Sequence, residues 1–146
     1  MRERLPDGLR IVRTIPGARA DVFDAWVDRE RLRTWWGPPG IIVSAVEGEV
    51  RVGGAIRIVM EQPGVEQRTL VWTFREIDPP ARLVYGWRWA DGPEAGPESL
   101  VTVRFRDAGE RTEVEIVHSG IADAAIRDSH GMGWQGCLDG LVATLN

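Results

Sequence analysis

The stretch TLVWTFREIDPPARLVYGWRW, residues 69–89, decides the fold. Apolar and polar residues alternate on both sides of Asp78-Pro79-Pro80, which predicts two strands, 69–77 and 82–89. Because so short a connection joins them, the strands are expected to be antiparallel. One face of this pair is apolar and rich in aromatic rings: Leu70, Trp72, Phe74, Leu83, Tyr85, Trp87 and Trp89.

The same period of two continues on either side of this pair. It predicts further strands at residues 9–15, 41–46, 55–61, 100–106 and 112–118, separated by connectors rich in Gly, Pro and Asp. The opposite face of these strands carries Arg, Thr and Glu, which belong in water. The pattern therefore predicts an antiparallel sheet with one solvent-exposed face and one buried face.

Helical spacing interrupts the strands at two places. After the first strand, Val22, Phe23, Trp26 and Val27 share one face of a short helix, and Asp28 can cap a second helix that ends with Trp35-Trp36. A long C-terminal helix over residues 126–145 carries the apolar face that must cover the sheet. The expected order is strand, two helices, six strands and one helix, an α+β fold.

Four glycines in the C-terminal helix conflict with that prediction. Each costs about 1 kcal/mol relative to Ala inside a helix. We expect Gly131 to Gly133 to fray at the start of the helix, and Gly136 and Gly140 to lie near the sheet or a cavity. The longest connector, residues 90–99, is a candidate mobile loop at the mouth of such a cavity.

Length and composition indicate a single domain over residues 1–146, with residues 1–8 flexible. The net charge of −4 and the absence of a basic run argue against nucleic acid as a partner. No apolar run is long enough for membrane insertion or a signal peptide, so a cytoplasmic protein is expected. Arg replaces Lys throughout, which is typical of a GC-rich, bacterial genome, and an exposed edge strand would permit a homodimer.

Four motifs in order resemble one known family. They are ADVFDAWVDRERLRTWW at residues 20–36, Gly53-Gly54 before a strand, EIDPP at residues 76–80 followed by Leu83, Tyr85 and Trp87, and a closing helix with His130, Gly133-Trp134, Leu138 and Leu141. Together they are similar to the activator of Hsp90 ATPase homologue 1-like family of the START/Bet v 1-like (SRPBCC) superfamily. The resemblance covers roughly residues 9–146.

This resemblance implies the helix-grip fold, in which a curved antiparallel sheet wraps a long C-terminal helix and two short helices close one end. The superfamily includes lipid carriers, hormone receptors and polyketide aromatase-cyclases, so the fold by itself does not settle the function.

Seven Trp residues favour an internal cavity that binds a hydrophobic or aromatic small molecule, as a carrier or a sensor. The alternatives are a cyclase or isomerase acting in the same cavity, and a protein-interaction or co-chaperone-like role. Each inward ring could equally belong to a closed core. The predicted ligand-binding residues are Trp36, Met60, Trp72, Phe74, Tyr85, Trp87, Phe105, Ile116, His118, Trp134 and Leu138.

Two residues are candidates for acid–base chemistry. His118 is the ionisable residue on the inward face of its strand, although it could also be a strand-end histidine bonded to backbone. Glu76 follows the inward phase of its strand, but pairing with Arg82 is the alternative. With two His and the single Cys137, neither a disulfide nor a metal site is expected, and no cofactor motif is present.

Overall fold

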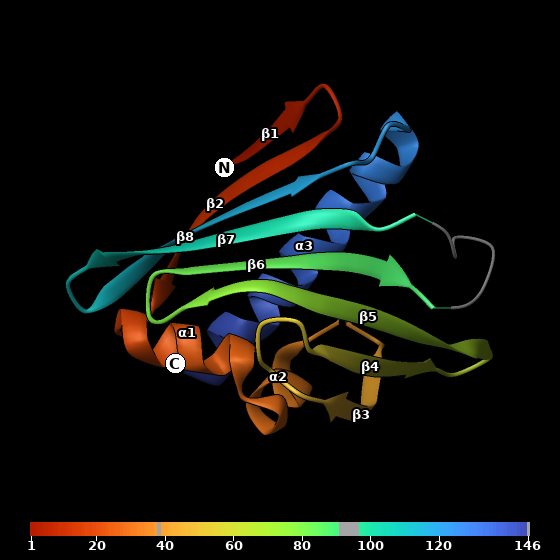
Figure 1. Cartoon of the computed structure of the whole chain (residues 1–146), viewed down its shortest axis with the longest axis horizontal. Helices are drawn as coiled ribbons and strands as arrows, with labels where there is room; N and C mark the ends of the chain where they lie inside the picture. Colours follow the sequence, from red (N-terminus) through yellow and green to blue (C-terminus); the bar gives the residue numbers. More distant parts are fainter. Residues whose placement is uncertain (38, 91–96, 146) are drawn as a thin grey trace.

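The computed structural model describes residues 1–37, 39–90 and 97–145. These form one antiparallel sheet and three helices (Figure 1). The helices are α1 (Arg19–Val27), α2 (Arg29–Trp35) and α3 (Ala124–Leu145). The strands are β1 (Arg2–Leu5), β2 (Gly8–Pro16), β3 (Ile42–Gly48), β4 (Ala55–Gln62), β5 (Val65–Asp78), β6 (Arg82–Trp89), β7 (Ser99–Ala108) and β8 (Arg111–Ser119).

The strands follow the order β1-β2-β8-β7-β6-β5-β4-β3. Consecutive strands from β3 to β8 are neighbours, as a meander requires, and β2 pairs with β8 from the other end of the chain. The long α3 crosses the inner face of the curved sheet, while α1 and α2 lie at one end of it (Figure 1). This is the helix-grip architecture expected from the sequence.

Local rules explain where the short helices begin and end. The Asp28 carboxylate accepts hydrogen bonds from the backbone N–H groups of Glu30 and Arg31, so it caps α2 as expected. Trp35 ends that helix, and its indole N–H donates to the Ala25 carbonyl of α1 at 2.9 Å. This bond fixes α2 against α1.

An additional strand, β1, occupies the segment for which flexibility was expected. It pairs antiparallel with β2, and the N-terminal ammonium donates to the Val12 carbonyl at 2.8 Å. Arg4 forms an ion pair with Asp128 of α3 at 3.3 Å. The sequence Arg-Glu-Arg-Leu has no apolar alternation, so the contacts that hold this strand could not be predicted from local pattern.

The C-terminal helix begins earlier than expected. It is continuous from Ala124, so the expected fraying at Gly131 to Gly133 is wrong. Close approach explains one of these glycines, because a Cβ on Gly140 would lie 2.7 Å from the Trp35 carbonyl oxygen. A Cβ on Gly131 would lie 2.9 Å from the guanidinium of Arg2, the end of an exposed and flexible side chain. A Cβ on Gly133 would meet open space. Of the predicted mouth loop, residues 91–96 lie outside the described part of the chain.

Candidate functional site

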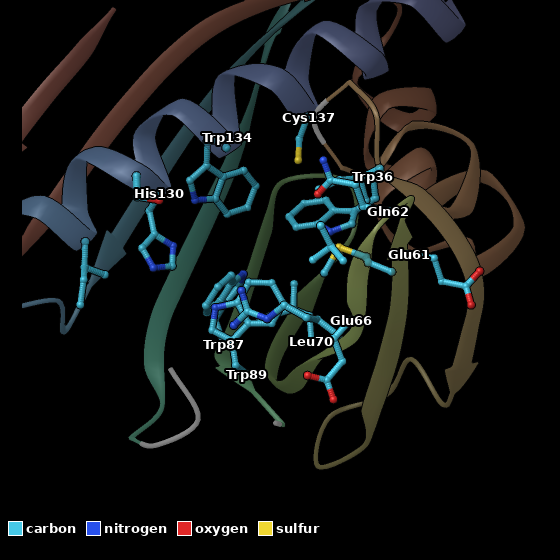
Figure 2. A pocket seen from close by; sticks show the side chains of 17 residues that line it. Trp36, Glu61, Gln62, Glu66, Leu70, Trp87, Trp89, His130, Trp134 and Cys137 are labelled. Carbon is cyan, nitrogen blue, oxygen red and sulfur yellow. The ribbon is translucent and has the colours of Figure 1, made fainter. Parts of the chain in front are cut away.

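A cavity of about 300 Å³ lies between α3 and the inner face of β4, β5 and β6 (Figure 2). Residues of α3 form one wall, and the strands form the facing wall. The lining residues are Trp36, Ile41, Met60, Glu61, Gln62, Val65, Glu66, Arg68, Leu70, Trp87, Trp89, Ile126, Ser129, His130, Gly133, Trp134 and Cys137.

The inner part of the cavity is apolar and aromatic. The Trp36 and Trp134 rings meet edge to face with centroids 5.3 Å apart, and both side chains are buried. Met60 and Leu70 complete this surface from β4 and β5. Rigid rings and apolar side chains of this kind form a slot suited to a flat apolar molecule.

Polar residues gather where the β4–β5 hairpin meets the cavity. Glu61, Gln62 and Glu66 come from the ends of these strands and are exposed (Figure 2). The Arg68 guanidinium carbon lies 3.7 Å from the centroid of the Trp89 ring, a cation–π contact. The cavity therefore combines an apolar interior with a charged border, which is common in small-molecule sites.

Cys137 is an apolar lining residue rather than a nucleophile. Its thiol is buried, and burial raises its pKa to about 12. The Gly37 N–H donates to Sγ at 3.3 Å. Because the thiolate is the reactive form, this cysteine is inert near neutral pH.

His118 lies behind the cavity wall in a closed hydrogen-bond network. The Trp134 indole N–H donates to His118 Nδ1 at 3.1 Å, and His118 Nε2 is 2.7 Å from the Ser99 hydroxyl oxygen. An indole nitrogen only donates, so Nδ1 is unprotonated and the neutral ring carries its proton on Nε2. That proton is donated to Ser99, whose hydroxyl donates to the Trp87 carbonyl at 3.0 Å.

This arrangement fixes the protonation state of His118. Burial, with a smaller contribution from His130, lowers its pKa to about 3. The ring is not a base for Ser99, because Nε2 already carries the proton that a base would have to accept. The network thus braces β6, β7, β8 and α3 against one another. The partners of the His118 ring are the side chains of Ser99 and Trp134. The expectation that a strand-end histidine would bond to the backbone is therefore wrong.

Four of the eleven predicted ligand-binding residues line the cavity: Trp36, Met60, Trp87 and Trp134. The other seven belong to a closed core and are buried with little or no exposure. These are Trp72, Phe74, Tyr85, Phe105, Ile116, His118 and Leu138.

Side chains of α1 close that part of the interior. Phe23 and Trp26 pack edge to face against Phe105 with ring centroids 5.1 and 5.6 Å away. The Trp26 indole N–H donates to the Tyr85 hydroxyl at 3.3 Å. The cavity is therefore confined to the end of the sheet near the β4–β5 hairpin.

Several cavity residues were absent from the predicted set. Leu70 and Trp89 share the inward phase of their strands with Trp72 and Trp87, so strand periodicity could have included them. Ile126, His130, Gly133 and Cys137 recur at intervals of four, three and four along one face of α3. This helical spacing could have assigned the four residues to one face of α3 from the sequence.

The second acid–base candidate lies elsewhere. The Glu76 carboxylate is 3.1 Å from Arg82 Nε in an ion pair and is not among the lining residues, so the expected alternative of pairing with Arg82 is confirmed. Among the residues that the structure describes, no group of three or more His, Cys, Asp or Glu side chains could hold a metal ion. Within the same ranges, no helix has the length and hydropathy needed to cross a membrane.

The curved sheet, the gripped helix and the cavity between them define the helix-grip class of the START/Bet v 1-like superfamily. Residues 17–146 match the family model described as activator of Hsp90 ATPase homolog 1-like protein. The chain belongs to this family. No curated protein matches it.

Solved structures agree with this assignment. A protein of Chromobacterium violaceum is 25% identical, with a TM-score of 0.87 and coverage of 97% of this chain and 98% of that chain. The AHSA1 protein of Silicibacter pomeroyi is 27% identical, with a TM-score of 0.80 and coverage of 93% and 95%. A protein of Arthrobacter aurescens shares the fold at 22% identity, with a TM-score of 0.84 and coverage of 99% and 90%.

Proposed function

We propose that this protein binds a hydrophobic or aromatic small molecule in the cavity between the sheet and α3, as a carrier or a sensor. The observation that carries the proposal is the cavity of about 300 Å³, walled by the rings of Trp36, Trp87 and Trp134. Burial of apolar ligand surface, at about 25 cal/mol per Å², would drive binding.

The site geometry favours binding over the alternative of a cyclase or isomerase. Both ring nitrogens of His118 are engaged, and Glu76 is paired with Arg82 outside the cavity. Neither candidate is therefore available to move a proton to or from a bound molecule. A co-chaperone-like role, the other alternative, would depend on the outer surface and would not require an open cavity.

Gly133 allows a direct test, because its missing side chain faces open space on the cavity wall. Gly133→Leu would extend a side chain into the cavity, so we expect the dissociation constant for tetralin, a bicyclic hydrocarbon, to rise at least tenfold in calorimetric titration. That factor equals about 1.4 kcal/mol. Gln135→Leu is the matched control, since Gln135 is an exposed residue of the same helix that does not line the cavity.

Unchanged tetralin binding in Gly133→Leu would contradict this location for the site. If the unmodified protein binds neither tetralin nor 1-tetralone, the corresponding ketone, the small-molecule function itself is wrong. Native mass spectrometry of freshly purified protein complements the titration, because a co-purifying molecule would reveal its own mass.

We also propose a cytoplasmic location and a homodimer. Strands β1 and β3 are the two edges of the sheet, and an unpaired edge can add a strand from a second copy. Size-exclusion chromatography with light scattering would separate a dimer of this 16.3 kDa chain from a monomer.

A further inference from the structure

Two tryptophans that line the cavity have an indole N–H group without a hydrogen-bond acceptor among the described residues. Trp87 and Trp89 both line the cavity, and the Nε1 atom of each is buried without a partner among the described residues. Leaving such a donor unsatisfied costs about 1–3 kcal/mol. Most buried side-chain polar atoms do have partners, so two orphan donors on one strand require an explanation.

Other tryptophans of this chain do find acceptors. The indole N–H groups of Trp26, Trp35 and Trp134 donate to Tyr85, to the Ala25 carbonyl and to His118, respectively. The fold thus satisfies these three buried indoles internally. Trp72 also has an orphan Nε1. Its buried ring does not line the cavity, although it packs edge to face against the lining residue Trp36 with ring centroids 5.0 Å apart.

Trp87 and Trp89 are positioned to act on the same ligand. They are two residues apart on β6 and therefore share its inner face, and their ring centroids are 5.2 Å apart. Trp87 is 7% exposed, so a hydrogen bond from its N–H would form in an environment with little competing water.

We propose that the ligand of this cavity carries a carbonyl oxygen that accepts hydrogen bonds from the indole N–H groups of Trp87 and Trp89. The ligand class is then an aromatic or conjugated ketone rather than a pure hydrocarbon. This inference rests on the small-molecule function proposed above.

The charges of the lining favour an uncharged acceptor. Glu61 and Glu66 contribute two carboxylates at the cavity border, against the single guanidinium of Arg68, which stacks on Trp89. These carboxylates would repel an anionic ligand, whereas they would not repel an uncharged ketone. A carbonyl oxygen has two lone pairs and can accept from both indoles.

The test compares 1-tetralone with tetralin, two bicyclic molecules that differ at one position by a carbonyl group. Calorimetric titration gives both dissociation constants. The dissociation constant of tetralin divided by that of 1-tetralone measures the preference for the ketone. We expect Trp87→Phe and Trp89→Phe each to lower this ratio by about 2- to 12-fold, the range that corresponds to one net hydrogen bond. Trp72→Phe is the matched control and should leave the ratio unchanged, because it removes an orphan indole outside the cavity.

A second measurement needs no variant and so does not depend on the variants folding. The carbonyl stretching band of 1-tetralone bound to the unmodified protein should lie below its frequency in hexane, as hydrogen bonding requires. The inference would be overturned if the ratio is unchanged in both variants and the band lies at its position in hexane. The indole N–H groups would then point toward neighbouring aromatic rings rather than toward the ligand, and the small-molecule function would remain intact. If neither compound binds, the proposed function fails first.

Discussion

Acidification from pH 7 to pH 5 is expected to destabilise the fold through His118. The folded protein holds this imidazole neutral, because Nδ1 accepts from Trp134 and burial disfavours the charged ring. The unfolded chain exposes it to water, where it takes up a proton below its ordinary pKa of 6.5. The stabilising contribution is therefore fully present above pH 6.5 and is lost progressively as the pH falls toward the folded value of about 3.

The size of the effect follows from these two pKa values. At pH 5 the unfolded imidazole is almost fully protonated, while the folded one remains almost fully neutral. Linkage then gives a decrease of about 2 kcal/mol in the free energy of unfolding between pH 7 and pH 5. This is a large fraction of the stability of an ordinary domain.

Urea denaturation at pH 7 and pH 5 would measure this decrease, with His118→Gln as the comparison. We expect this variant, which lacks the imidazole, to be less stable at both pH values. The decrease in its free energy of unfolding on acidification should be smaller by about 2 kcal/mol. The comparison removes the contribution of groups that titrate alike in the two proteins. Equal decreases in the two proteins would refute the reasoning, and so would an NMR titration in which the His118 ring protonates near pH 6.5.

Three further predictions concern the stability of the fold. Gly140→Ala should lower the free energy of unfolding by up to about 2 kcal/mol, because its Cβ would lie 2.7 Å from the Trp35 carbonyl oxygen and overpacking, at about 1–3 kcal/mol, outweighs the gain of about 1 kcal/mol in helix propensity. Urea denaturation that shows the variant to be more stable would contradict this close contact. Asp28→Ala should cost about 1 kcal/mol through loss of the α2 cap, while Asp28→Asn should retain most of it, and equal thermal midpoints for both would contradict the capping role. Burial alone would raise the pKa of Glu115, but hydrogen bonds from Arg10 and Arg104 outweigh it and lower the pKa, so its contribution is present above its ordinary value of 4.5 and is lost as the pH falls below it. Glu115→Gln should therefore reduce the loss of stability in acid, and a pH profile that matches the unmodified protein would exclude this role.

Local pattern predicted most of the fold. Alternation of apolar residues determined the strands from Leu9 onward and assigned Trp72, Trp87 and Phe105 to the inner face, because the period of a strand is a property of neighbouring residues. The capping role of Asp28 was predictable for the same reason. The β1 strand was not, since its contacts with Asp128 and Gly131 join residues from opposite ends of the chain.

The sequence by itself determined which rings face inward and that a long helix covers them. Which of those rings border empty space was decided only by the tertiary structure. Phe23 and Trp26 of α1 fill one end of the interior, while the missing side chain of Gly133 leaves the other end open. A cavity is the volume that remains after elements distant in sequence have packed together, so no local pattern can locate it.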